Sequence, residues 1–178
     1  LRIAHGFLAA GAGPGTHVAL QMENGPEQIC AALAAAAIRA VKIPVNPSLS
    51  AGELQFVLSQ SEAEYLVTDG PLRHEAEKTC LKQVIHLGGP DSSAGLPVTS
   101  WEDFLEAGRG MTLEDPGNGE HGGEPSDIIY TSGSTKAPKG VLLTHDMLMR
   151  SAFASCRSRG FELGRRIFVP LPIVHVYA

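Results

Sequence analysis

The sequence predicts an α/β fold, in which a mostly parallel sheet is flanked by helices. Short apolar segments alternate along the chain with segments whose apolar residues recur at helical spacing. The apolar segments are continuous runs, which is typical of strands covered on both faces, as in parallel sheets. The composition, 43% hydrophobic and 19% charged over 178 residues, is that of a globular protein with a substantial core.

Turn and capping residues separate the elements in the first part of the chain. A helix begins the sequence and ends at the glycine-rich run Gly11–Gly15, and Pro26 suits the first turn of the next helix. Ser50 and Glu53 form the pattern of a capping box, and Ser100 precedes a short helix. The helices are therefore expected at residues 1–10, 26–40, 71–80 and 146–157, and after Ser50 and Ser100. The strands are expected at residues 17–22, 41–45, 65–68, 83–87, 127–131, 141–144 and 167–169.

A polar stretch at residues 112–126, rich in glycine and proline, is the best candidate for an exposed linker. It divides the chain into a first α/β portion, residues 1–111, and a second portion, residues 127–178. In the second portion two strands flank the loop between Tyr130 and Gly140, and Thr144 is the expected N-cap of the helix that follows.

Charge and cysteine content exclude several kinds of protein. The net charge of −5 argues against a broad nucleic-acid surface, which needs clustered lysine and arginine. Cys30, Cys80 and Cys156 lie far apart without a CxxC pair, so we expect neither a disulfide framework nor a zinc site, but buried or otherwise inert thiols. The longest apolar run, Ile29–Ile38, is too short for a membrane span, and no secretory signal opens the chain. These features favour a cytoplasmic protein.

The loop YTSGSTKAPKG, from Tyr130 to Gly140, has the composition of a phosphate-binding loop. Glycines let backbone N–H groups converge on an anion, while hydroxyl groups and two lysines supply further donors and positive charge. The loop is not a Walker A motif, because Pro138 stands where that motif needs glycine. The residues alone leave two alternatives open: a phosphate site at the carboxyl edge of the sheet, or a simple hairpin loop.

The run YTSGSTKAPKGVLLTH, Tyr130–His145, resembles the signature of the adenylate-forming enzymes, which include acyl-CoA synthetases, firefly luciferase and the adenylation domains of peptide synthetases. The usual form is (Y/F)TSG(S/T)TGxPKGV, followed by a Thr/Ser-His pair. Further resemblances lie in the strand after Gly13 with Asn24 beyond it, in the segment Ile43–Pro47 with Glu53, and in LPIVHVYA, Leu171–Ala178. The sequence VNP at residues 45–47 is most like that of the CoA ligases.

This resemblance implies that residues 1–178 form part of the large N-terminal domain of an AMP-forming ligase, without its small C-terminal domain. The implied reaction activates a carboxylic acid, fatty or aryl, with ATP and Mg²⁺, and then passes the acyl group to CoA. The chain alone is expected to be inactive. Adenylation that feeds a carrier protein, or a non-catalytic nucleotide- or partner-binding remnant of the fold, are the alternatives.

The resemblance also implies which residues bind the substrates. The expected nucleotide-binding residues are Thr131, Ser132, Gly133, Ser134, Thr135, Lys139 and Gly140. His175 and Tyr177 are expected at the acid pocket, and no catalytic or metal-binding residue is assigned within the chain. Two departures stand out, because Lys136 and Arg39 occupy positions where the family usually has glycine.

Overall fold

The computed structural model describes residues 1–71, 79–89, 96–113, 121–131, 138–166, 168 and 171–174. Its helices are α1 (Arg2–Ala9), α2 (Pro26–Ala37), α3 (Ala51–Gln60), α4 (Trp101–Ala107) and α5 (His145–Arg159). Its strands are β1 (His17–Gln21), β2 (Val41–Pro44), β3 (Tyr65–Thr68), β4 (Gln83–His86), β5 (Val98–Ser100), β6 (Pro125–Thr131) and β7 (Lys139–Thr144). The expected helix near residues 71–80 and the expected strand at residues 167–169 fall largely outside the described residues.

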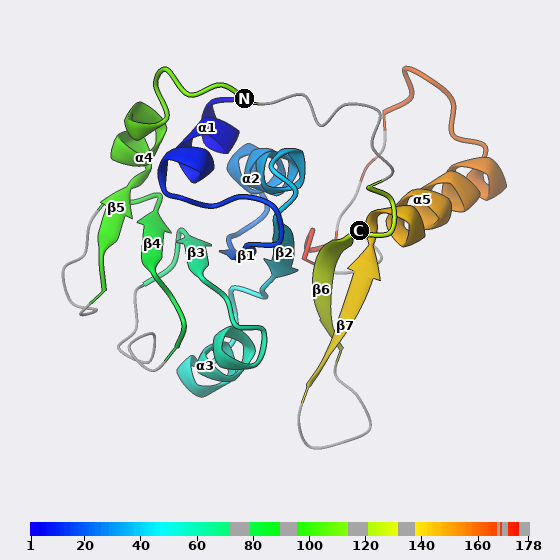
Figure 1. Cartoon of the computed structure of the whole chain (residues 1–178). Coiled ribbons are helices and arrows are strands. Elements are labelled where there is room, and N and C mark those ends of the chain that lie inside the picture. The colour runs from blue at the N-terminus through cyan, green and yellow to red at the C-terminus, as the bar shows by residue number, and fades with distance from the viewer. Residues whose placement is uncertain are drawn as a thin grey trace.

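The strands form one sheet in the order β5-β4-β3-β1-β2-β6-β7 (Figure 1). Neighbouring strands from β5 to β6 are parallel, and β7 alone among the described strands runs antiparallel, as the edge partner of β6. The predicted fold class is therefore confirmed. Strand β5 was not predicted, because its three residues, Val98–Ser100, lack the apolar run that marked the other strands.

Helices cover both faces of the parallel part of the sheet. Helices α1, α2 and α4 lie over one face and α3 lies over the other (Figure 1). Residues of β1 alternate between the two faces: Val18 and Leu20 pack beneath α1 and α2, whereas Ala19 joins the cluster beneath α3. Because both faces of the strand are buried, its sequence is largely a continuous apolar run, as expected for a strand inside a parallel sheet.

The predicted caps are present at three helix starts. The Ser50 hydroxyl accepts a hydrogen bond from the Glu53 N–H, and the Glu53 carboxylate accepts one from the Ser50 N–H at 2.8 Å, which completes the capping box. The Ser100 side chain accepts from the Asp103 N–H at 3.0 Å, and the Thr144 side chain accepts from the Met147 N–H at 3.3 Å. Each cap satisfies an N–H group that the helix itself leaves unpaired.

Helix α2 ends at Ala37, three residues before the expected end, because the backbone turns into a left-handed conformation. Arg39 has a φ of 60°, in the region where glycine is favoured and where the resemblance expects a glycine. Its guanidinium donates two hydrogen bonds to the carboxylate of Glu124, which also binds His121. This ion pair offsets part of the conformational cost of a non-glycine residue at the turn.

Strand β6 attaches the second portion of the chain to the first. It pairs with β2, and within this pairing the Lys42 ammonium lies 2.9 Å from the Asp127 carboxylate, both side chains being almost buried. Ser126, which is fully buried, accepts from Lys42 and donates to Asp127. The strand begins at Pro125, two residues earlier than expected. Pro125 is exposed, whereas Ser126, the last residue of the predicted linker, is buried.

Candidate nucleotide-binding site

The signature loop connects two antiparallel strands. Thr131, the last residue of β6, pairs with Lys139, the first residue of β7, and Tyr130 pairs with Gly140. The two sequence alternatives, a hairpin loop and a phosphate loop, are thus compatible with one another. Five loop residues singled out from the sequence lie outside the described residues, as do both residues assigned to the acid pocket: Ser132, Gly133, Ser134, Thr135, Lys136, His175 and Tyr177.

Tyr130 fastens the end of β6 to α3. Its hydroxyl donates to the side-chain oxygen of Gln60 and lies 3.4 Å from the carbonyl of Val57. Burial raises the pKa of Tyr130, so the phenol stays protonated and remains a donor at neutral pH. The strand that leads into the loop is therefore held against a helix of the first portion, which gives the loop a fixed starting point.

Gly140 lies where its strand passes close to its neighbours. A Cβ atom at this position would lie 2.9 Å from Ile128 Cγ2 and 3.2 Å from the Tyr130 ring, closer than side chains normally pack. The close approach of β7 to β6 and α3 thus requires glycine here. This requirement is independent of any contact with a nucleotide, and sequence reasoning missed it.

The last residue pair before the loop, Thr131 and Lys139, is polar and carries a positive charge. Thr131 and Lys139 are exposed, and Lys139 forms no ion pair with any residue that the structure describes. Because β6 is parallel to β2 and β1, its carboxyl end belongs to the same edge of the sheet as theirs, where ligands bind in open α/β sheets. An ammonium without an ion-pair partner among the described residues, next to a hydroxyl at such an edge, suits an anionic ligand.

The segment that leads into His175 lies at the carboxyl end of β1. The Asn24 side chain donates to the carbonyl of Leu171 at 3.0 Å and accepts from the N–H of Ile173 at 2.8 Å. No hydrogen bond among the described residues joins this segment to the hairpin. Sequence reasoning noted Asn24 as part of the resemblance but missed its partner, because no local pattern links residues 147 positions apart.

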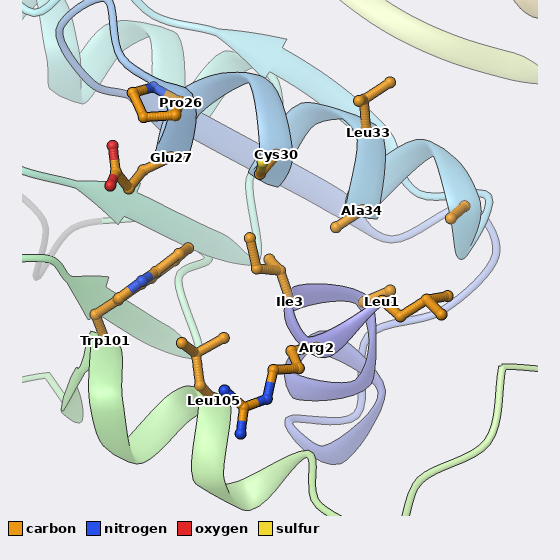
Figure 2. Close-up of a pocket in the computed structure, with 12 residues that line it drawn as sticks. Leu1, Arg2, Ile3, Pro26, Glu27, Cys30, Leu33, Ala34, Trp101 and Leu105 are labelled. Carbon is orange, nitrogen blue, oxygen red and sulfur yellow. The ribbon is translucent and has the colours of Figure 1, made fainter.

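A cavity of about 660 Å³ lies elsewhere, between the helices that cover one face of the sheet. Figure 2 shows Ile3, Cys30, Ala34, Trp101 and Leu105 around it, from α1, α2 and α4. The lining is mainly apolar and contains none of the residues predicted to bind substrates. Although a large apolar pocket is the usual first choice for a binding site, this one offers few convergent polar groups and is not supported as the nucleotide site.

Several further features bear on the function. Within the described ranges, no group of three His, Cys, Asp or Glu side chains is placed to hold a metal ion. None of the described helices is long and apolar enough to cross a membrane. Cys30, Cys80 and Cys156 are free and exposed. Of the two expectations for these thiols, buried or otherwise inert, the first is therefore wrong, and the second stays a prediction.

Comparison with known proteins places these features in a family. The model of the AMP-binding enzyme family matches residues 1–178. A long-chain-fatty-acid–CoA ligase of Mycobacterium tuberculosis is 30% identical over 99% of this chain and 34% of its own length. Long chain acyl-CoA synthetase 1 of Arabidopsis thaliana is 32% identical over 82% of this chain and 24% of its own length.

The fold agrees with these sequence relatives. The crystal structure of a long-chain-fatty-acid–CoA ligase from Archaeoglobus fulgidus superposes on 98% of this chain with a TM-score of 0.83 and 26% identity. The matched region is 34% of that chain, so the sequence spans about a third of the length of its structural relative. With the family model matched from the first residue to the last and the fold shared with a solved ligase, the chain belongs to the AMP-binding enzyme family, the adenylate-forming enzymes.

Proposed function

We propose that the full-length protein carrying this chain activates a carboxylic acid with ATP to an acyl-adenylate and then transfers the acyl group to CoA. The observation that carries the proposal is the signature hairpin. The last residue pair before its loop, Thr131 and Lys139, lies at the carboxyl edge of a mostly parallel sheet. Membership of the AMP-binding enzyme family and its CoA-ligase relatives support the reaction class.

The first step brings together two anionic substrates. A carboxylate oxygen attacks the α-phosphorus of ATP, the bond to the bridging oxygen breaks, and pyrophosphate leaves with that bond's electron pair. The loop's task is to hold the β- and γ-phosphates while negative charge builds on the leaving group. Lys139 supplies the positive charge, and Thr131 with Ser132, Gly133, Ser134 and Thr135 supplies hydroxyl and backbone donors.

In the second step the thiol of CoA loses its proton to solvent, its sulfur attacks the acyl carbonyl carbon, and AMP leaves with the electrons of the acyl–oxygen bond. We assign His175 and Tyr177 to the neighbourhood of the acid in both steps. The relatives named as long-chain-fatty-acid ligases support a fatty acid as the substrate class.

Mg²⁺ would be held at this site mainly by the phosphates of ATP rather than by protein side chains. In nucleotide enzymes Mg²⁺ keeps several waters and is held largely by the substrate's phosphates, with one or two carboxylates. The described residues contain no cluster of acidic side chains that could hold the ion by itself. This is compatible with a Mg²⁺ ion that binds together with ATP and is held mainly by its phosphates. When bound, the ion neutralises phosphate charge, while Lys139 and the loop donors orient the triphosphate.

The proposal is tested by carboxylate-dependent exchange of labelled pyrophosphate into ATP, measured with the full-length protein and fatty acids of graded length. Lys139→Ala or Thr135→Ala should lower the exchange rate about a hundredfold, since each removes one group that stabilises the leaving phosphates. The matched control is Lys82→Ala, which removes an exposed lysine that pairs with Glu64. Lys82 directly precedes β4, and three strands lie between β4 and β6 in the sheet. Absence of exchange in the wild type with every acid tested would overturn the proposal.

Two further measurements define its limits. Formation of an acyl-CoA thioester by the wild type supports CoA as the acceptor, whereas exchange without thioester formation would indicate a carrier protein. The 178-residue chain alone should show no exchange, because it spans only about a third of the length of its CoA-ligase relatives. Exchange catalysed by this chain alone would contradict that expectation.

A further inference from the structure

Asn24 makes a contact that neither the family signature nor the proposed chemistry assigns. The residue follows β1, and its side-chain amide binds both the carbonyl of Leu171 and the N–H of Ile173, 147 and 149 positions further along the chain. Both bonds have good lengths, 3.0 and 2.8 Å. One side chain thus holds a distant backbone segment by two groups at once.

The chemistry of the contact is specific to a carboxamide. A carboxamide carries a donor and an acceptor on one planar carbon, so it matches a backbone carbonyl and a backbone N–H that point the same way. Here the two backbone groups flank Pro172, which has no N–H of its own and whose ring fixes φ. An aspartate at position 24 would lose the donor, and an alanine would lose both bonds.

The backbone around Asn24 is itself fixed. The N–H of Glu23 donates to the Asp69 carboxylate at 3.0 Å, which ties the turn after β1 to the end of β3. Gly25 is the N-cap of α2 and Pro26 is its first residue, and no side chain caps this helix. Asn24 is therefore not used to cap the adjacent helix, although asparagine commonly serves that purpose. Its amide is committed to the distant segment instead.

We propose that Asn24 is a positioning residue. It fixes the backbone of Leu171–Ile173 at the carboxyl end of β1 and thereby positions the residues that immediately precede His175 in the sequence. The sequence reaches His175 two residues after the bound N–H of Ile173. The functional part of this inference rests on the proposed function, because His175 is assigned to the acid there. The contact itself does not depend on that assignment.

The kinetic test compares Asn24→Ala with the wild type in the full-length protein, using pyrophosphate exchange. Loss of the two hydrogen bonds should raise KM for the acid about tenfold and leave KM for ATP within about twofold, because the phosphate hairpin keeps its own anchors. The matched control is Asn46→Ala, an asparagine after β2 whose side chain binds only the nearby Ser48 N–H among the described residues. Unchanged acid KM, or an equal rise in both KM values, would overturn the positioning role.

A second readout requires no activity. In Asn24→Ala the amide hydrogen of Ile173 should exchange with solvent about tenfold faster, while the amides of β1 and β3 keep their wild-type rates. An unchanged Ile173 rate, or faster exchange throughout the sheet, would overturn the contact. If the wild type shows no exchange of pyrophosphate but the Ile173 amide responds as expected, the proposed function fails and the contact stands.

Discussion

The two portions of the chain are held in different ways. In the first, residues 1–111, the sheet is covered on both faces, and Phe7, Leu58 and Phe104 are buried almost completely. In the second, none of the residues of α5, all of them described, is buried, and β7 leaves Val141 and Leu142 exposed. The hairpin joins the first portion through strand pairing and through the polar contacts Lys42–Asp127 and Tyr130–Gln60 instead, and Glu124, just before β6, adds a contact with Arg39.

This difference shows how a loop can be anchored through the strand before it rather than through a hydrophobic core of its own. The anchors act on the strand that precedes the loop and on the residue before that strand, so they fix where the loop begins. Several apolar side chains of the second portion, among them Met147, Met149 and Phe153, are exposed.

The largest expected effect on stability is that of Phe7→Ala, which is compared with the matched substitution Phe153→Ala. Phe7→Ala removes a ring that is fully buried and packs edge-on against Phe104 at 5.1 Å between centroids, and should cost about 3–5 kcal/mol of unfolding free energy. Phe153→Ala removes a ring that is 66% exposed and should change stability by less than about 0.5 kcal/mol. Denaturant titration measures both, and equal losses would show that the two portions are packed alike.

The buried ion pair between the portions gives the next effect. Lys42→Met leaves the Asp127 carboxylate almost buried without its cation, which should cost about 3 kcal/mol. The double variant Lys42→Met, Asp127→Leu should be close to the wild type, since no charge is left unpaired. A thermal unfolding series of the two variants measures this, and an additive loss in the double variant would contradict the account.

Glu124→Gln should have the smallest effect, and one that depends on pH. The hydrogen bonds from Arg39, and then from His121, lower the pKa of Glu124 from 4.5 to about 2. A lowered carboxyl pKa adds stability that is fully present above pH 4.5 and is lost as the pH falls toward 2. Unfolding curves of wild type and variant should therefore differ at neutral pH and converge in acid. A constant difference across this range would remove Glu124 as its cause.

Much of the fold could be predicted from local signals. The strand at Tyr65–Thr68 was placed correctly because it is a continuous apolar run between turns, and the Ser50–Glu53 capping box fixed the start of α3. Strand β5 was missed because Val98–Ser100 depends on pairing with β4 for its conformation. The end of α2 was misplaced because Arg39 at positive φ is supported by Glu124, a residue distant in sequence.

In the candidate site, too, the residues of a local sequence pattern could be predicted, whereas contacts between distant residues could not. The signature residues, from Thr131 to Lys139, were recognisable because they are contiguous and chemically distinctive. The close packing that requires glycine at position 140 could not be recognised from the sequence, and neither could the hydrogen bonds from Asn24 to Leu171 and Ile173. Both depend on residues that approach one another only in the folded structure. The nucleotide-binding assignments, the division into portions at residues 112–126 and the cytoplasmic location stay predictions.

The central claim, that the hairpin between β6 and β7 holds the phosphates of ATP, is tested most directly by a crystal structure of the full-length protein with a non-hydrolysable ATP analogue and Mg²⁺. The account predicts the β- and γ-phosphates within roughly 3 Å of the loop N–H groups and of the Lys139 ammonium. Phosphates bound in the cavity between α1, α2 and α4, or anywhere away from the hairpin, would contradict it.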